Sequence, residues 1–280
     1  MNGDRALVNL SVPERMPRGK ATYASGAGVA LITLSNPPAN GYSHDMMRDL
    51  DEAVLRARFD DGIQAIVLAG EGEKFFCAGA DISMLHAVTP SFKYQFCLHA
   101  NETLLRLEHT PKLVLAAIGG HCVGGGLEIA LACDLRIARK GSGKCGLPEV
   151  SLGVLPGTGG TQRLARVVGK ARAIELMASG RLFAFEEALT LGIVQEVREA
   201  ASEAAFVAAC VEYARSFCTP GKGALAVGAI KRSVQTGSEI PLESGLALER
   251  ELQARLFASE DAREGVAAFV EKRPATFQGR

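Results

Sequence analysis

The chain has 280 residues, of which 31 are basic and 31 acidic, and 48% are apolar. This length allows a substantial core, and this apolar fraction excludes an intrinsically disordered chain. A formal net charge of zero gives no general electrostatic attraction to nucleic acid or to an anionic membrane.

The N-terminal residues argue against export and organelle targeting. The segment MNGDRALVNLSVPERMPRGK lacks the apolar stretch of a secretory signal, and Asp4 and Glu14 argue against a transit peptide. No apolar run reaches the length of a membrane span. The seven cysteines form no C-x-x-C pair, which is typical of reduced thiols. We therefore expect a cytoplasmic protein that does not contact a membrane.

Strands and helices alternate over the first two thirds of the chain. GVALITL (28–34) and QAIVLAG (64–70) are apolar runs typical of buried strands, and the residues between them have apolar side chains at helical spacing. This strand–helix–strand order predicts parallel pairing in a buried sheet. The pattern continues with a helix over 91–109, a strand over 113–118, a helix from about 126 and a strand over 135–138.

Four helices without strands are predicted after residue 198, over 202–218, 222–235, 241–258 and 260–272. Pro220 and Gly221 separate the first two, and Ser259 is a suitable N-cap for the last. The sequence thus predicts an α/β body over 1–198 and a helical region over 199–280. Because these helices have no sheet of their own, we expect them to pack on the body or on a neighbouring subunit.

Several familiar sites are excluded by missing motifs. The sequence has no G-x-x-x-x-G-K-[ST], no G-x-S-x-G, no H-E-x-x-H and no Cys/His cluster with ligand spacing. No G-x-G-x-x-G follows a strand. A P-loop, a serine nucleophile, a zinc site and a nicotinamide site are therefore unsupported, and we expect no bound metal.

The first informative segment is AAIGGHCVGGGLEIALACDLRIA (116–138), where a strand leads through glycines 124–126 into an apolar helix. Glycines at a helix N-terminus allow a ligand to approach free N–H groups that favour negative charge. Glu128 lies in the first turn of this helix, and the alternative to a catalytic role is that it caps its own helix. His121 has no paired acid or serine nearby, so we interpret it as structural.

The second segment is CGLPEVSLGVLPGTGGTQRL (145–164). Glu149 is an isolated acid in an apolar, glycine-rich stretch, and the alternative to catalysis is a surface salt bridge. Gln162 and Arg163 follow at a predicted helix start, where we expect them to fix the helix and a subunit contact rather than touch substrate.

The third segment is GEGEKFFCAGADISML (70–85), which follows a strand. Its small residues Ala78, Gly79 and Ala80 expose backbone N–H groups, so this turn can supply a second donor. We expect Asp81 to cap the next helix and Cys77 to be a small buried hydrophobe rather than a reactive thiol.

FFCAGADI, GGGLEIALACDLRIA and GLPEVSLGVLPGTGGTQRL resemble the three signature segments of the enoyl-CoA hydratase/isomerase (crotonase) family, and EGVAAFVEKRPATFQGR resembles the family's C-terminal end. The motifs occur in the family's order from about Gly28 onward. The resemblance implies a crotonase-like α/β body, a ββα spiral, followed by an all-helical trimerisation region. It also implies homotrimers often paired into hexamers, and acyl-CoA thioester substrates with no metal or redox cofactor.

The resemblance also implies roles for individual residues. The backbone N–H groups of Ala80 and Gly125 would form an oxyanion hole, and Glu128 and Glu149 match the two catalytic glutamates of the hydratases. Residues expected to contact substrate or CoA are Ala39, Ala78, Ala80, Asp81 and Ile82, together with Phe269 and Lys272 near the nucleotide end, where a neighbouring subunit could supply them. The loop SNPPANGYS (35–43) departs from the hydratase pattern and is more similar to the isomerase version.

The presence of both glutamates favours an enoyl-CoA hydratase, which adds water reversibly and syn to a 2-trans-enoyl-CoA to give a 3-hydroxyacyl-CoA in acyl-CoA breakdown. Glu128 would deprotonate the water and Glu149 would protonate Cα. One alternative is a Δ3,Δ2-enoyl-CoA isomerase or a specialised hydroxyacyl-CoA dehydratase. Another, of a different class, is an inactive protein that binds RNA or CoA, and the zero net charge counts against RNA as its partner.

Overall fold

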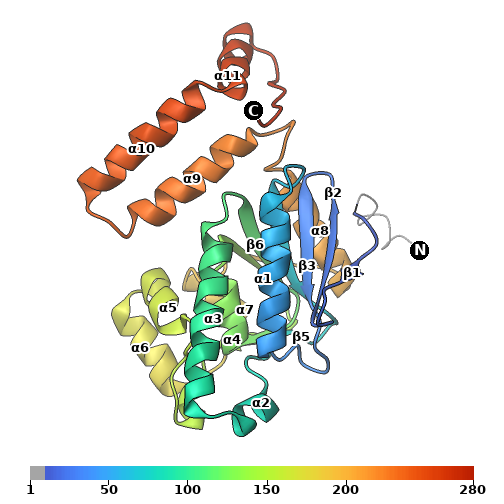
Figure 1. Cartoon of the computed structure of the whole chain (residues 1–280), viewed down its shortest axis with the longest axis vertical. Coiled ribbons are helices and arrows are strands. Elements are labelled where there is room, and N and C mark those ends of the chain that lie inside the picture. Colours follow the sequence, from blue (N-terminus) through green and yellow to red (C-terminus); the bar gives the residue numbers. More distant parts are fainter. Residues whose placement is uncertain (1–9) are drawn as a thin grey trace.

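Two β-sheets and a projecting arm of helices make up the structure, a computed structural model that describes residues 10–280 (Figure 1). Residues 1–9, on which part of the targeting argument rests, lie outside the described residues. The larger sheet has the order β1-β2-β3-β4-β6-β8-β11 and the smaller one β10-β9-β7-β5. The α/β class predicted from the sequence is confirmed by this architecture.

The strands of the larger sheet are β1 (Glu14–Arg15), β2 (Ala21–Gly26), β3 (Val29–Leu34), β4 (Ala65–Gly70), β6 (Leu113–Ile118), β8 (Leu135–Arg139) and β11 (Glu196–Arg198). The smaller sheet contains β5 (Phe75–Cys77), β7 (His121–Val123), β9 (Lys144–Gly146) and β10 (Phe183–Ala184). The body helices are α1 (His44–Phe59), α2 (Ile82–Ala87), α3 (Pro90–His109), α4 (Gly125–Leu131), η1 (Glu149–Leu152), α5 (Gly160–Val168), α6 (Lys170–Ser179), α7 (Phe185–Thr190) and α8 (Glu203–Arg215).

The centre of the larger sheet is parallel, as the strand–helix–strand pattern predicts. Ile32 of β3 lies opposite Leu68 of β4, which lies opposite Ala116 of β6. The apolar runs in these strands are buried on both sides because helices cover both faces of the sheet. The antiparallel strands β1 and β2 were not predicted, since their mixed sequence, such as ATYASG in β2, has no continuous apolar run.

Each face of the larger sheet has its own core. On one side, residues such as Met47 of α1 and Leu104 of α3 pack with Ile32 and Leu68. On the other side, α8 packs against β3, β4 and β6 through Phe206. The division predicted after residue 198 coincides with the end of β11, and the first helix after it, α8, covers the sheet rather than standing apart.

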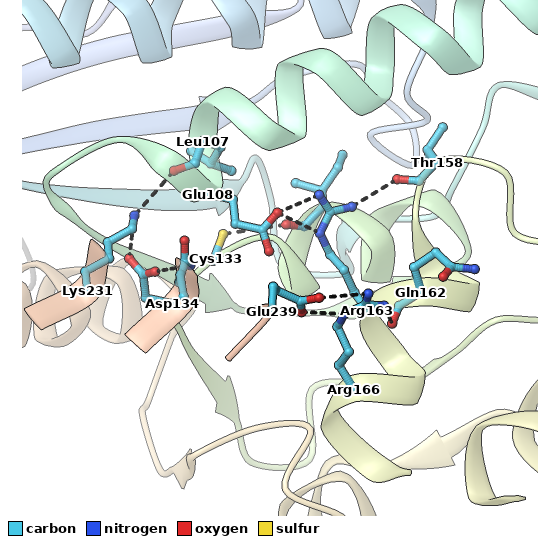
Figure 2. Close-up of polar contacts among 12 residues, drawn as sticks. Leu107, Glu108, Cys133, Asp134, Thr158, Gln162, Arg163, Arg166, Lys231 and Glu239 are labelled. Atoms are coloured by element: carbon cyan, nitrogen blue, oxygen red, sulfur yellow. Dashed lines mark hydrogen bonds and ion pairs between the residues drawn. The ribbon is translucent and has the colours of Figure 1, made fainter. Parts of the chain in front are cut away.

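The arm consists of α9 (Ala224–Gly237), α10 (Leu242–Phe257) and α11 (Glu260–Glu271), which extend from one end of the body (Figure 1). Its attachment includes Lys231 of α9, whose buried Nζ lies 2.8 Å from Asp134 (Figure 2). The predicted cap is confirmed, since the Ser259 hydroxyl accepts from Ala262 N–H at 3.0 Å. Large apolar side chains of the arm are more than half exposed in the single chain, including Ile230, Val234, Phe257 and Phe269. Over residues 10–280, every helix is too short or too polar to cross a membrane.

Candidate active site

Three parallel strands of the smaller sheet bring the three signature segments together. Cys77 of β5 lies opposite Cys122 of β7, which lies opposite Cys145 of β9. Because parallel strands end at the same edge of a sheet, the segments that follow them meet there. These segments are the Ala78–Asp81 turn, the glycine turn before α4 and the start of η1.

The first predicted donor is the N–H of Ala80, which faces away from the neighbouring segment that contains Tyr42. Tyr42 N–H donates to Gly79 O at 2.8 Å, and Asp81 N–H donates to Tyr42 O at 2.9 Å. Because Tyr42 forms backbone hydrogen bonds with Gly79 and Asp81, the residues on both sides of Ala80, the N–H of Ala80 points away from Tyr42. Within residues 10–280 it donates to no protein acceptor.

The second predicted donor is close to the first. Gly125 is the first residue of α4, where an N–H has no partner inside the helix. No acceptor for it occurs in the described part of the chain. A Cβ built on Gly79 would lie 3.3 Å from the Gly125 nitrogen, so the two turns are in contact. The site therefore presents two unpaired N–H groups from adjacent turns, as an oxyanion hole requires.

Close packing explains the run of glycines. A Cβ on Gly125 would lie 1.6 Å from the ring of Tyr42, and one on Gly126 would lie 2.2 Å from Cys77 O. Gly124 has φ 55°, which side chains rarely allow. The triple glycine thus lets α4 begin directly against an aromatic ring and strand β5.

Glu128 is buried, with 1% of its surface exposed, and its carboxylate is surrounded by donors. It accepts hydrogen bonds from Thr158 N–H at 2.8 Å and Gly160 N–H at 2.7 Å, and a further one from the Thr158 hydroxyl. Two of these donors belong to Thr158, in the loop before α5, and the third belongs to Gly160, the first residue of α5. The alternative that Glu128 caps its own helix is therefore wrong.

Glu149 is the first residue of η1 and has a different environment. Its Oε2 atom is buried without a hydrogen-bond partner among the described residues. The pKa of Glu149 is raised to about 7, chiefly by burial; a hydrogen bond from its own backbone N–H lowers it, the nearby charge of Glu128 raises it and Lys93 lowers it. Glu149 forms no salt bridge within the described residues, so the surface-pair alternative is wrong. A Cβ built on Gly124 would lie 2.9 Å from Glu149 Oε1, so Glu149 reaches the glycine turn from which the helix that carries Glu128 begins.

The residues predicted to contact the acyl-CoA near the oxyanion turn lie together. Ala78 N–H donates to Ala39 O at 3.0 Å, which ties the 35–43 loop to this turn. The Asp81 side chain accepts from Met84 N–H at 3.1 Å, so the predicted cap is confirmed. Ile82, the first residue of α2, is exposed.

Phe269 and Lys272 are not brought to this site within one chain. Phe269 lies in α11 with 86% of its surface exposed, and Lys272 is the C-cap of that helix. Helix α11 lies at the opposite end of the molecule from α2 (Figure 1). A neighbouring subunit would have to bring these two residues to the site.

Two side chains near the acids were missed by the sequence analysis. The Tyr42 hydroxyl lies 3.3 Å from the Thr158 hydroxyl, which in turn donates to Glu128. The Tyr42 ring stacks on Phe96 at 5.4 Å. Burial raises the pKa of Tyr42 well above its usual value, so its phenol remains protonated at neutral pH. An isolated tyrosine in a loop and a threonine between glycines have no pattern that would have identified them.

The remaining candidates are structural. Cys77 is fully buried, burial raises its pKa to about 12, and all seven cysteines are free. His121 Nδ1 accepts from Lys144 N–H at 3.2 Å, which fixes the connection between β7 and β9. No three potential metal ligands cluster anywhere in residues 10–280. The chemistry available at this edge is therefore hydrogen-bond donation to an oxyanion and proton transfer by two carboxyl groups.

Comparison with known proteins agrees with this geometry. Residues 24–280 match the family model for enoyl-CoA hydratase/isomerase. The chain is 35% identical to the short-chain-enoyl-CoA hydratase of Clostridium acetobutylicum, over 88% of this chain and 92% of that protein. It is 38% identical to the (E)-benzylidenesuccinyl-CoA hydratase of Thauera aromatica, over 90% and 96%. The crystal structure of an enoyl-CoA hydratase from Geobacillus kaustophilus matches with a TM-score of 0.91 and 42% identity, over 96% of this chain and 99% of that one.

Proposed function

The chain belongs to the enoyl-CoA hydratase/isomerase family, and we propose that this enzyme adds water reversibly to a 2-trans-enoyl-CoA to give a 3-hydroxyacyl-CoA. The observation that carries the proposal is the pair of acids beside two free N–H groups. One acid is held by three donors and the other has an unpaired, buried oxygen. Of two carboxyl groups in such different environments, one can accept a proton while the other donates one.

In the proposed reaction the thioester oxygen accepts hydrogen bonds from the N–H groups of Ala80 and Gly125. These donors stabilise the enolate-like charge, and the loss of one such donor typically costs about 3 kcal/mol. Their fixed orientation supports this role, because they do not need to reorganise as charge develops.

Glu128 and Glu149 would then carry out opposite proton transfers: one acid accepts a proton and the other donates one. Glu128 takes a proton from water as the water oxygen bonds to C3. Glu149, protonated near neutral pH because burial raises its pKa to about 7, gives its proton to C2. The hydrogen-bonded carboxylate of Glu128 is suited to hold and orient the water. Proton exchange with solvent then returns the pair to its starting state.

We further propose that the functional unit is a homotrimer or a hexamer in the cytoplasm, with no metal or redox cofactor. The exposed apolar side chains of the arm support a subunit contact, since isolated chains rarely expose so many. In such an assembly Phe269 and Lys272 of a neighbouring copy would approach the CoA nucleotide. Sedimentation equilibrium tests this assembly, and a monomer that retains full activity would contradict it.

The reaction is tested with a panel of 2-enoyl-CoA esters that vary in length and branching, since the acyl group is not specified by this site. Hydration removes the conjugated thioester absorbance, and the product is identified by mass as the substrate plus water. A 3-enoyl-CoA converted without gain of water would instead identify an isomerase. Tight, salt-sensitive RNA binding with no turnover of any ester would contradict an enzymatic role.

A further inference from the structure

Arg163 of α5 reaches the loop that holds Glu128. Its Nε and Nη2 atoms lie 3.2 and 2.8 Å from Glu108 Oε2, and its Nη1 atom donates to Thr158 O at 3.4 Å (Figure 2). The two side chains are mostly shielded from water, with 11% of Arg163 and 24% of Glu108 exposed. The ion pair therefore fixes the guanidinium in one orientation more firmly than an exposed pair would.

The guanidinium also lies directly against Gly159. A Cβ on Gly159 would be 2.0 Å from Arg163 Nη1, and Gly159 has φ +115°, which favours glycine. Gly159 stands between the two residues whose N–H groups donate to Glu128. The loop is thus contacted on one side by the Glu128 carboxylate and on the other by Arg163.

Residue 158 links these two sides through a single amino acid. The carbonyl of Thr158 accepts from Arg163, while its N–H and hydroxyl donate to Glu128. We propose that Arg163, fixed by Glu108, is a positioning residue that holds the 158–160 loop in the conformation that orients Glu128. This inference rests on the proposed role of Glu128 in hydration.

The effect is geometric rather than electrostatic. Glu108 neutralises the charge of Arg163, so Arg163 has little electrostatic effect on Glu128. The hydrogen bond to Thr158 O is long, so by itself it contributes little to the free energy that holds the loop. Together, the hydrogen bond to Thr158 O and the close approach of Arg163 to Gly159 restrict movement of the loop away from Glu128. A small displacement of a catalytic group can cost about a hundredfold in rate.

Arg166 offers a matched control on the same helix. Its Nε and Nη2 atoms lie 2.6 and 3.0 Å from Glu239, in the connection between α9 and α10 (Figure 2). It is half exposed, and the contacts of its side chain are with Glu239 and Gln162 O rather than with the 158–160 loop. Both arginines thus form ion pairs, but only Arg163 contacts the backbone that holds Glu128.

The test compares R163Q, R163K, E108Q and R166Q by steady-state kinetics with the enoyl-CoA that the wild type hydrates best. We expect R163Q to lower kcat about 10- to 100-fold with KM changed by less than about threefold. R163K should have a kcat between those of R163Q and the wild type, because lysine keeps the ion pair with Glu108 but cannot donate a second hydrogen bond to Thr158 O at the same time. E108Q should lower kcat in the same direction by less, and R166Q should match the wild type.

The decisive comparison repeats R163Q in an E128Q background. Because Arg163 acts through Glu128, R163Q should cause no further loss there. A further loss as large as that in the wild-type background would overturn the proposal, as would a wild-type kcat for R163Q.

Hydrogen exchange of the 156–160 segment provides a readout that does not depend on the reaction. The amides of Thr158 and Gly160 should exchange faster in R163Q than in the wild type, and R166Q should leave them unchanged. Unchanged exchange in R163Q would contradict positioning by Arg163. If the wild type hydrates no enoyl-CoA but the amides of R163Q still exchange faster than those of the wild type, the proposed function is contradicted and the positioning by Arg163 is not.

Discussion

The two sides of the candidate site differ although both present a glutamate. On one side, Glu128 is enclosed by three donors from the 158–160 loop, which Arg163 contacts from behind. On the other, Glu149 lies at the start of a short 3₁₀ helix with one carboxyl oxygen buried and unpaired. Three donors hold the Glu128 carboxylate in one orientation, whereas burial favours the neutral form of Glu149, so the surroundings rather than the residue type separate the two proposed roles.

The largest expected effect comes from removing either acid. Glu128→Gln and Glu149→Gln should each lower kcat by about 10²–10⁴-fold, because general acid–base catalysis typically contributes that much. Binding of a non-reactive acyl-CoA, measured by calorimetry, should persist in both variants. Near-wild-type turnover by either variant would show that its role is misassigned and that the two sides of the site do not divide the work as proposed.

The next effect concerns Gly125, which lies between the two sides. Gly125→Ala places a Cβ 1.6 Å from the Tyr42 ring, so the ring must move and its contact with Thr158 is lost. We expect the free energy of unfolding to fall by about 1–3 kcal/mol through overpacking. Urea denaturation measures this change.

Gly221→Ala is the matched control for Gly125→Ala, because its nearest neighbour would be 3.7 Å away. Equal stabilities of the two alanine variants would contradict the close packing of Tyr42 on α4.

An effect of similar size is expected from Thr158→Val, which acts only on the Glu128 side. Valine keeps the shape but removes a hydroxyl donor from a buried carboxylate, at a cost of about 1–3 kcal/mol. The melting temperature Tm and kcat of the valine variant should both decrease. Thr158→Ser should remain close to the wild type in kcat because it keeps the hydroxyl. A valine variant as active as the wild type would remove Thr158 from the support of Glu128.

The smallest effect is the pH dependence of stability on the Glu149 side. Its folded pKa of about 7 lies above the ordinary value of 4.5, so the folded protein retains a proton that the unfolded chain releases between these values. Stability from this group is complete below pH 4.5 and is lost as the pH rises through 7. Glu149→Gln avoids this loss, so it should be more stable than the wild type by about 1–2 kcal/mol at pH 8. Urea denaturation at pH 5 and pH 8 measures the change, and a difference that does not grow with pH would contradict an unpaired, buried carboxyl group.

The sequence alone predicted the four parallel strands β3, β4, β6 and β8, the helices after residue 198 and the three signature turns, because each depends on patterns within a few neighbouring residues. Apolar runs predict buried strands, Ser259 before two acids predicts a helix start, and three glycines predict a close approach to the start of α4. The resemblance to a family added the pairing of Glu128 with Glu149, which spacing could not supply.

Only the tertiary structure decided what surrounds each acid. The donors to Glu128 lie about thirty residues further along the chain, the ion-pair partner of Arg163 lies on α3, and the ring against Gly125 comes from a loop before α1. In the same way, packing decided that α8 covers the sheet while α9–α11 stand apart. Burial and the identity of hydrogen-bond partners depend on contacts between distant segments, and the local sequence carries no record of those contacts.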